Sequence, residues 1–421
     1  MEIINEWGSV FLILAIVFGL YMTWGIGAND VANAMGTSVG SGAITIRQAI
    51  LIAAVCEFIG AFVAGGDVTE TIRNGIIDAE TMDGQPELLV YGMLASLLAA
   101  GIWLMIASAR GWPVSTTHSI VGAIVGFAVA GIGLHAVHWE MIGQIVASWV
   151  ISPLLGGVVA LLIMLSIRHL ILNAENPFRQ AKRWGPVYVF VVGWIVSLVS
   201  LFKGLKHLDL HLTPNESLIA ATIFGLVTGL IGKVLIDRVK VDEKADRAFH
   251  FASVEKVFTP MMIFTACAMA FAHGSNDVAN GIGPMAAVVS VIESGGTVAQ
   301  KSQLPLWILL LGGIGIVVGL ATLGYRVMQT IGTRITELTP TRGFSATLAA
   351  AAVVVLASKT GLPVSTTHIA VGAVMGVGLS RGIAALDLRV IGNIVISWLI
   401  TLPAGAILAA LFFYLFKFSF S

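Results

Sequence analysis

The chain has 421 residues, of which 57% are hydrophobic and only 11% are charged, and its formal net charge at pH 7 is zero. Soluble domains carry about 25% charged residues, so this composition excludes a soluble fold and indicates an integral membrane protein. The zero net charge offers no basic surface for binding nucleic acid. The two cysteines, Cys56 and Cys267, are too few for a disulfide framework or a cysteine-based metal cluster.

Apolar segments that approach the roughly 20 residues of a transmembrane helix recur along the whole chain. We predict an all-α membrane protein with about twelve transmembrane helices. The segments are 8–27, 47–66, 88–108, 114–134, 140–167, 186–202, 217–236, 256–273, 305–326, 343–358, 364–380 and 389–416. Polar motifs follow the first and eighth segments, beside several glycines, so we expect unwound breaks or the second halves of broken helices there. Spans 3–4 and 10–11 could cross fully or form re-entrant hairpins.

Four sequence markers occur twice, in the same order and roughly 250 residues apart. They are N-D-V-A-N (29–33 and 276–280), P-V-S-T-T-H (113–118 and 363–368), I-V-x-S-W (145–149 and 394–398) and, more weakly, V-T-E-T-I-R-N-G-I (68–76) with V-M-Q-T-I-G-T-R-I (327–335). We infer an internal duplication. Residues 1–167 form the first repeat with spans 1–5. Residues 168–255 hold spans 6 and 7 and a loop. Residues 256–421 form the second repeat with spans 8–12.

Equivalent spans are seven apart, an odd number, so the two repeats enter the membrane in opposite directions. Such inverted-topology repeats are common in secondary transporters, whose substrate sites lie at the repeat interface. Most of the 23 Lys and Arg residues fall in the odd-numbered loops, including the charged stretch 237–250. The positive-inside rule then predicts cytoplasmic odd-numbered loops and two extracytoplasmic termini.

Polar side chains are costly in lipid, so the duplicated motifs predict a functional cavity. Asparagine and aspartate oxygens suit a small hard cation. The predicted cation ligands are Asn29, Asp30, Asn33, Asn276, Asp277 and Asn280.

The P-V-S-T-T-H motif predicts a helix N-terminus with three consecutive hydroxyl groups, which is a favourable environment for an anion. Its two copies supply Ser115, Thr116, Thr117, Ser365, Thr366 and Thr367. Hydroxyl groups four residues apart could line the same cavity, and the two histidines that end the motif could orient it. These accessory candidates are Ser148, Ser152, Ser397, Thr401, His118 and His368.

These motifs resemble the inorganic phosphate transporter family, whose members are sodium- or proton-coupled phosphate symporters. The resemblance rests on GANDVANAMGTSVGSGAIT, AHGSNDVANGIGP, VTETIRNGII, GWPVSTTH, GLPVSTTH and SWVISP, and covers nearly the whole chain. It implies a dimeric multi-pass protein of the cell membrane that imports phosphate with a cation and needs no cofactor besides the transported sodium ions or protons. Glu57 falls where the family carries a glutamate, whereas Thr347 stands where the family often has another.

The resemblance implies which ions the two predicted sites bind. The hydroxyl residues would bind phosphate together with Asp30 and Asp277, and the N-D-V-A-N residues would bind sodium. Proton coupling and transport of sulfate or another tetrahedral oxyanion stay open as alternatives. So does a channel, which would lack stoichiometric coupling. An intramembrane hydrolase built on Ser115, His118 and Asp30 is disfavoured, because a nucleophilic enzyme needs one activated site and every member here is duplicated.

Overall fold

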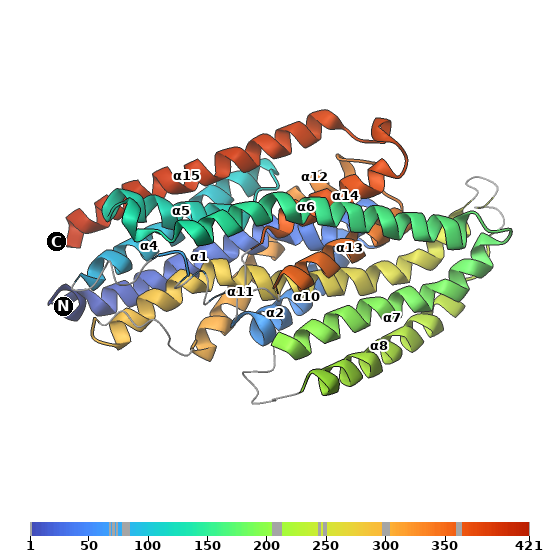
Figure 1. Ribbon diagram of the computed structural model, residues 1–421, viewed down its shortest axis with the longest axis horizontal. Coiled ribbons are helices and arrows are strands. Elements are labelled where there is room, and N and C mark those ends of the chain that lie inside the picture. The colour runs from blue at the N-terminus through green and yellow to red at the C-terminus, as the bar shows by residue number, and fades with distance from the viewer. Residues whose placement is uncertain are drawn as a thin grey trace.

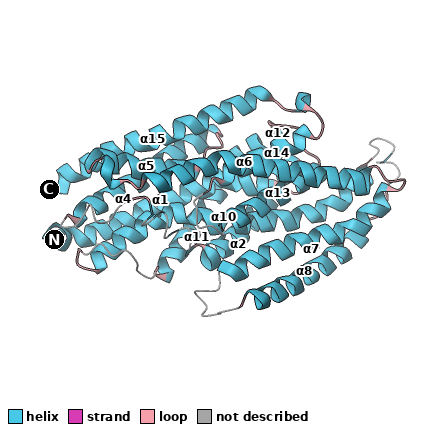
Figure 2. Ribbon diagram, in the orientation of Figure 1, coloured by secondary structure: helices cyan, strands magenta, loops and turns pink. Residues whose placement is uncertain are grey.

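The computed structural model describes residues 2–66, 69, 72, 75–77, 85–203, 213–242, 246, 251–296, 304–358 and 364–420. This part of the chain is almost entirely helical, with one isolated bridge between Ile77 and Val137 (Figure 2). The helices are α1 (Glu2–Gly40), α2 (Ile46–Ala64), α4 (Pro86–Arg110), α5 (Thr116–Gly131), α6 (Trp139–Ile167), α7 (Pro177–Lys203), α8 (Pro214–Asp237), α10 (Ala252–Glu293), α11 (Leu306–Thr322), α12 (Gly324–Thr333), α13 (Pro340–Ser358), α14 (Thr366–Leu379) and α15 (Leu388–Phe420). Short 3-10 or π turns occur at Leu134–Ala136, Arg168–Leu172 and Ile383–Ala385.

Each of the twelve predicted segments is largely helical, and 305–326 covers α11 and the start of α12, but the helices differ in length. Eight described helices are long and apolar enough to cross a membrane, or nine if the bent pair α11 and α12 forms one broken span with its 68° bend. The helices α5 and α14 have 16 and 14 residues. At 1.5 Å per residue they reach only about 24 and 21 Å, less than the roughly 30 Å hydrocarbon core. The predicted multi-pass helical architecture is confirmed, and these two helices are too short to span the hydrocarbon core.

The short helices belong to two hairpins. Hairpin 1 is α4 and α5 with their connection (86–131), and hairpin 2 is the packed pair α13 and α14 with the residues described between them (340–358 and 364–379). In hairpin 1, an added Cβ at Gly92 would meet the ring of Phe127, so the two arms run antiparallel and turn at residues 111–115. The αL conformation of Gly111 (φ 69°) ends α4, and Ser115 caps α5. Hairpin 1 therefore turns back inside the bundle, and both α5 and α14 begin at a buried N-cap serine, Ser115 and Ser365.

The helices α1 and α10 pack side by side in opposite directions through the middle of the bundle (Figure 1). Gly8 of α1 approaches Ile292 of α10, whereas Gly19, eleven residues later, approaches Met285. The two chain termini lie at the same end of the molecule (Figure 1), where the rings of Trp7 and Phe420 are 5.3 Å apart. The two helices that carry the N-D-V-A-N copies, α1 and α10, therefore run in opposite directions.

The N-D-V-A-N motifs do not lie at helix breaks. Both α1 and α10 continue without interruption through residues 29–33 and 276–280, so the expectation of an unwound backbone there is wrong. The neighbouring glycines permit close helix crossing instead. A Cβ on Gly27 would lie 1.9 Å from the backbone oxygen of Ile316 in α11, and one on Gly274 would lie 2.2 Å from the backbone oxygen of Glu57 in α2. The continuous helices present side chains rather than free carbonyl groups to the centre.

The Gly27 crossing predicts a steric effect that is independent of helix propensity. Gly27→Ala should destabilise the protein by about 1–3 kcal/mol or more, because overpacked cores cost this much and the obstacle here is backbone. Gly143→Ala is the matched control, since nothing lies within 4 Å of a Cβ at that helical position. Melting temperatures in detergent measure both effects. Equal melting temperatures for the two variants would contradict the close crossing.

The charge bias also predicts how the bundle is oriented. In a Cys56→Ser, Cys267→Ser background, Glu6→Cys should react with an impermeant thiol reagent in intact cells. Glu175→Cys, in the turn between α6 and α7, should react only after the cells are permeabilised. The reverse pattern of labelling would show that the termini are cytoplasmic.

Candidate functional site

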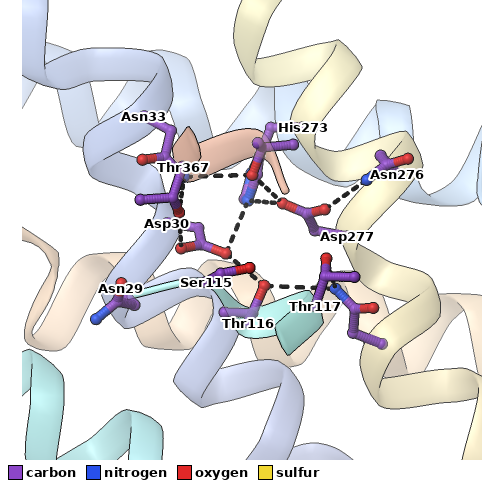
Figure 3. A network of polar contacts seen from close by, with 12 residues as sticks. Asn29, Asp30, Asn33, Ser115, Thr116, Thr117, His273, Asn276, Asp277 and Thr367 are labelled. Carbon is purple, nitrogen blue, oxygen red and sulfur yellow. Dashed lines mark hydrogen bonds and ion pairs between the residues drawn. The ribbon is translucent and has the colours of Figure 1, made fainter. Parts of the chain in front are cut away.

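The candidate site lies where the N-terminal ends of α5 and α14 meet the C-terminal halves of α1 and α10 (Figure 3). The side chains predicted from the duplicated N-D-V-A-N and S-T-T motifs all gather there, and each is at most 2% exposed. Ser115 and Ser365 begin α5 and α14 as N-caps, with their hydroxyl oxygens accepting hydrogen bonds from the backbone N–H groups of His118 and His368 at 3.1 and 3.2 Å. The N-terminal N–H groups of both short helices therefore face the centre of the protein.

Each aspartate accepts a hydrogen bond from a hairpin threonine. The hydroxyl group of Thr116 donates to Asp30 Oδ2 at 2.7 Å, and that of Thr366 donates to Asp277 Oδ2 at 2.5 Å. Thr367 lies 3.2 Å from the other oxygen of Asp30. The carboxylates and the helix N-termini that favour an anion thus form one cluster rather than two separate sites.

Asn33 and Asn280 connect α1 to hairpin 2 and α10 to hairpin 1 by hydrogen bonds. Asn33 Nδ2 donates to the hydroxyl oxygens of Thr366 and Thr367, at 3.3 and 2.9 Å. In matching fashion, Asn280 Nδ2 lies 3.4 and 3.2 Å from the hydroxyl oxygens of Thr116 and Thr117. These donor contacts orient the two amides and leave both Oδ1 atoms buried without a hydrogen-bond partner. Two equivalent, desolvated carbonyl oxygens of this kind suit coordination of a cation.

The two hairpin turns also bind each other. Thr117 donates to the backbone oxygen of Val364 at 3.1 Å, and Thr367 donates to the backbone oxygen of Val114 at 3.1 Å. The same exchange at both turns holds the two short helices with their N-termini facing one another across the aspartates. The equivalence matches the duplication seen in the sequence.

Asn29 and Asn276 differ from the other predicted cation ligands. The Asn29 side chain accepts from the backbone N–H of Val114 at 3.1 Å and donates to the backbone oxygen of Trp112 at 2.9 Å, so it fastens α1 to the turn of hairpin 1. Asn276 Nδ2 donates to Asp277 Oδ1 at 2.7 Å. In this conformation both side chains support the site through its neighbours.

Sequence reasoning did not select His273, which lies at the centre of the cluster. Its Nε2 is 3.0 Å from Asp277 Oδ2 and 3.8 Å from Asp30 Oδ2, and its Nδ1 is 3.2 Å from Glu57 Oε1. The histidine, like all three carboxylates, is fully buried. The only sequence signal was an asymmetry: the copies read I-G-A-N-D and H-G-S-N-D, so Ile26 is the counterpart of His273. Within the N-D-V-A-N segments, the duplication is therefore broken at this ionisable position.

The cluster has the donor atoms for a cation and for an anion. Oxygen or nitrogen atoms of Asp30, His273 and Asp277 lie within 4.8 Å of one another. The helix N-termini and threonine hydroxyl groups beside them favour negative charge. Among the described residues, no Lys or Arg ion pair reaches either aspartate. A bound anion would therefore meet carboxylates whose charge is offset only by His273 or by added cations.

The two motif histidines are packed between tryptophans of the flanking helices. The rings of His118 and His368 are 4.3 Å apart, and they lie 3.6 and 3.7 Å from the rings of Trp149 and Trp398. His368 Nδ1 is also 3.2 Å from the backbone oxygen of Trp149. These contacts join the hairpins to α6 and α15, and no described hydrogen bond links either histidine to the aspartates.

The other accessory candidates lie on α6, α15 and α13. Ser148, Ser397 and Thr401 each donate to a backbone oxygen of their own helix, at 2.6–2.7 Å. Ser152 is buried, and its hydroxyl group has no described partner. Thr347, at the position where the resembled family often has glutamate, is hydrogen-bonded to Thr37 of α1 at 2.6 Å.

Comparison with known proteins agrees with the architecture and the motifs. The sequence model of the "Phosphate transporter family" matches residues 26–409. A Haemophilus influenzae protein named "Putative phosphate permease" is 49% identical over 417 residues, 99% of each chain. The Arabidopsis thaliana protein named "Inorganic phosphate transporter 2-1, chloroplastic" is 44% identical over 95% of this chain and 71% of that protein.

A solved structure extends the agreement to three dimensions. The protein named "The sodium-dependent phosphate transporter" is 41% identical, with a TM-score of 0.89 over 97% of this chain and 99% of that one. These matches cover nearly the whole sequence and both copies of the duplicated motifs. The chain is therefore a multi-pass membrane protein of the phosphate transporter family, and a transporter rather than an enzyme.

Proposed function

We propose that the protein imports inorganic phosphate across the cell membrane together with a cation, which we take to be sodium. The observation that carries this proposal is the paired arrangement of Asp30 with Thr116 and of Asp277 with Thr366, beside the unpartnered amide oxygens of Asn33 and Asn280. Oxygen ligands for a hard cation and hydroxyl groups for an oxyanion occur here in one closed cluster. One site of this composition can bind both ions at once.

Phosphate would be held by the six hydroxyl residues of the hairpin turns and by the N-termini of α5 and α14. Thr116 and Thr366 now donate to the aspartates, and the same hydroxyl groups can turn to donate to a phosphate oxygen. A protonated phosphate oxygen can in turn donate to an aspartate. Sulfate carries no proton at neutral pH and would meet only repulsion from the carboxylates, which favours phosphate.

Sodium ions would remove the repulsion between the carboxylates and a phosphate dianion. Bare charges of like sign strongly repel each other in a cavity of low dielectric constant. A sodium ion near Asp30 could use Asn33 Oδ1, and one near Asp277 could use Asn280 Oδ1, since both oxygens lack hydrogen-bond partners. Sodium and phosphate should then each raise the affinity for the other. The matching solved structure is that of a sodium-dependent phosphate transporter, which supports this choice of cation.

Proton coupling is the second candidate, and His273 is the observation that favours it. The imidazole lies between Glu57 and the two aspartates, so a proton taken up there would place a positive charge where a sodium ion is otherwise required. A histidine can change its charge near neutral pH. The two candidates predict different responses to sodium and to pH.

Alternating access would follow from movement of one repeat against the other. The antiparallel packing of α1 and α10 and the matching contacts of the two hairpin turns support two inverted repeats with the site at their interface. In the present conformation the site residues are closed to solvent. The expected homodimer stays a prediction for this chain.

The threonine hydroxyl groups are tested first. Thr366→Val keeps the shape of the side chain but removes the donor to Asp277, so it should weaken phosphate binding roughly tenfold or more, because buried groups left unpaired cost about 1–3 kcal/mol. Thr116→Val should act similarly. Thr259→Val on α10 is the control, since its hydroxyl group bonds only a carbonyl one turn away, that of Glu255 at 3.3 Å. Wild-type phosphate affinity in both site variants, measured by calorimetry, would remove these threonines from the site.

The coupling ion is tested by titrating phosphate at several sodium concentrations, with choline as replacement. We expect phosphate affinity to rise with sodium in the wild type. Asp30→Asn and Asp277→Asn should lose this response and should narrow the preference for phosphate over sulfate. An affinity that ignores sodium but rises as the pH falls, and that loses its pH response in His273→Gln, would instead establish proton coupling. Aspartate variants that retain the sodium response would contradict the role given to N-D-V-A-N.

A further inference from the structure

A cavity of about 400 Å³ lies beside the turn of hairpin 1, outside the closed site. Its walls come from the end of α4, the end of α12 and the first third of α15, far from the C-terminus of that helix (Figure 1). The lining residues that bear on ligand binding are Arg110, Trp112, Pro113, Arg334, Asn393 and Ser397. Small-ligand sites commonly measure about 300–1,000 Å³, so a hydrated small anion fits this space.

The charge of the cavity is positive. Two arginines line it, and none of its lining residues is acidic. Neither Arg110 nor Arg334 forms an ion pair with a described residue, and the Arg110 guanidinium lies 5.2 Å from the centre of the Trp112 ring. The nearby Arg326 is different, because its guanidinium donates to the backbone oxygen of Ala109 at 2.8 Å. Both arginines are exposed, so two cations without an ion-pair partner are available to attract an anion into the cavity.

The three turn residues that line the cavity, Gly111, Trp112 and Pro113, have hydrogen-bonded carbonyl groups. The backbone oxygens of Gly111, Trp112 and Pro113 accept hydrogen bonds from Thr330 at 2.8 Å, Asn29 at 2.9 Å and Trp398 at 3.2 Å. Asn393 and Ser397 add an amide and a hydroxyl group to the wall. The next two residues after Pro113 are Val114 and Ser115, which belong to the hairpin turn of the central site. The cavity-lining residue Pro113 is therefore two residues before Ser115, the first predicted phosphate ligand of this turn.

The two arginines have no arginine counterparts in the duplicated sequence. Hairpin 1 reads A-S-A-R-G-W-P, whereas the duplicate reads A-S-K-T-G-L-P, with Thr360 and Leu362 as the counterparts of Arg110 and Trp112. In the other duplicated segment, Gly75 is the counterpart of Arg334. The duplicate therefore does not repeat this pair of arginines at the same positions, although Lys359 directly precedes Thr360 in the sequence.

We infer that the cavity between Arg110 and Arg334 is a second oxyanion site, which holds a phosphate group beside the central site on the predicted cytoplasmic side. Paired guanidinium groups bind phosphate oxygens through charge-assisted hydrogen bonds. Transported phosphate is the favoured source of the group because the base of the cavity leads to the hairpin turn; this assignment depends on the proposed symport. The exposed side chains of Ile396 and Ile400 at the rim would also admit a phospholipid headgroup.

Equilibrium dialysis with labelled inorganic phosphate, at saturating sodium and constant ionic strength, tests the inference. The wild type should show a tighter and a weaker class of bound phosphate. Arg110→Gln combined with Arg334→Gln should weaken the second class about tenfold or more and leave the first within twofold. Thr366→Val should do the opposite. Arg47→Gln, an exposed arginine outside the cavity, should preserve both classes.

The double arginine variant tests this inference, whereas Thr366→Val tests the proposed function. Loss of the weaker class alone in the double arginine variant supports the cavity site. Retention of both classes, or their joint loss, contradicts it. A failure of Thr366→Val to affect the tighter class would bear on the proposed function only.

A lipid source is distinguished by measuring phosphatidylglycerol that remains on the protein after purification from vesicles containing this lipid. If the wild type retains it, the double arginine variant does not, and excess phosphate fails to displace it, the bound group is a headgroup. If no weaker phosphate class is found and lipid retention is equal in the two proteins, the cavity is not an oxyanion site.

Discussion

Two aspartates buried at the centre of a membrane protein impose the main physical constraint on this structure. Ionised carboxylates are very costly to remove from water unless hydrogen bonds or opposite charges compensate them. Asp30 and Asp277 obtain this compensation from the hydroxyl groups of Thr116 and Thr366, from the facing N-termini of α5 and α14, and from His273. The short hairpin helices are needed because only a helix that begins inside the bundle can direct its N-terminus at these carboxylates.

The same constraint explains why the surrounding helices pack so closely. The N-D-V-A-N motifs remain in regular helices, so α1 and α10 must bring side chains to the centre by crossing their neighbours at short distance. Gly27 and Gly274 allow this, because each faces the backbone of a neighbouring helix. Side-chain amides then replace free carbonyl groups as candidate cation ligands. The unpaired oxygens of the cluster include Asn33 Oδ1 and Asn280 Oδ1, which occur as an equivalent pair.

Much of this arrangement could be predicted from the sequence because it is duplicated. Repeated P-V-S-T-T-H identified two helix N-termini, and repeated N-D-V-A-N identified the polar residues that they meet. The features that were missed depend on three-dimensional packing. Asn29 resembles Asn33 in type and spacing, yet it binds the turn of hairpin 1 at Val114. His273 has no duplicate, and its importance arises only when α2 brings Glu57 beside it. Glycines near a motif could indicate either a helix break or a close crossing, and sequence alone did not distinguish them.

The central claim is that one closed cluster of carboxylates, amides and hydroxyl groups couples phosphate movement to a cation. The most direct measurement is uptake of labelled phosphate into proteoliposomes, with sodium and proton gradients imposed separately. The account predicts accumulation of phosphate above its equilibrium level when an inward sodium gradient is present, and none in Asp30→Asn or Asp277→Asn. Phosphate that only equilibrates across the membrane, whichever gradient is applied, would contradict coupled transport.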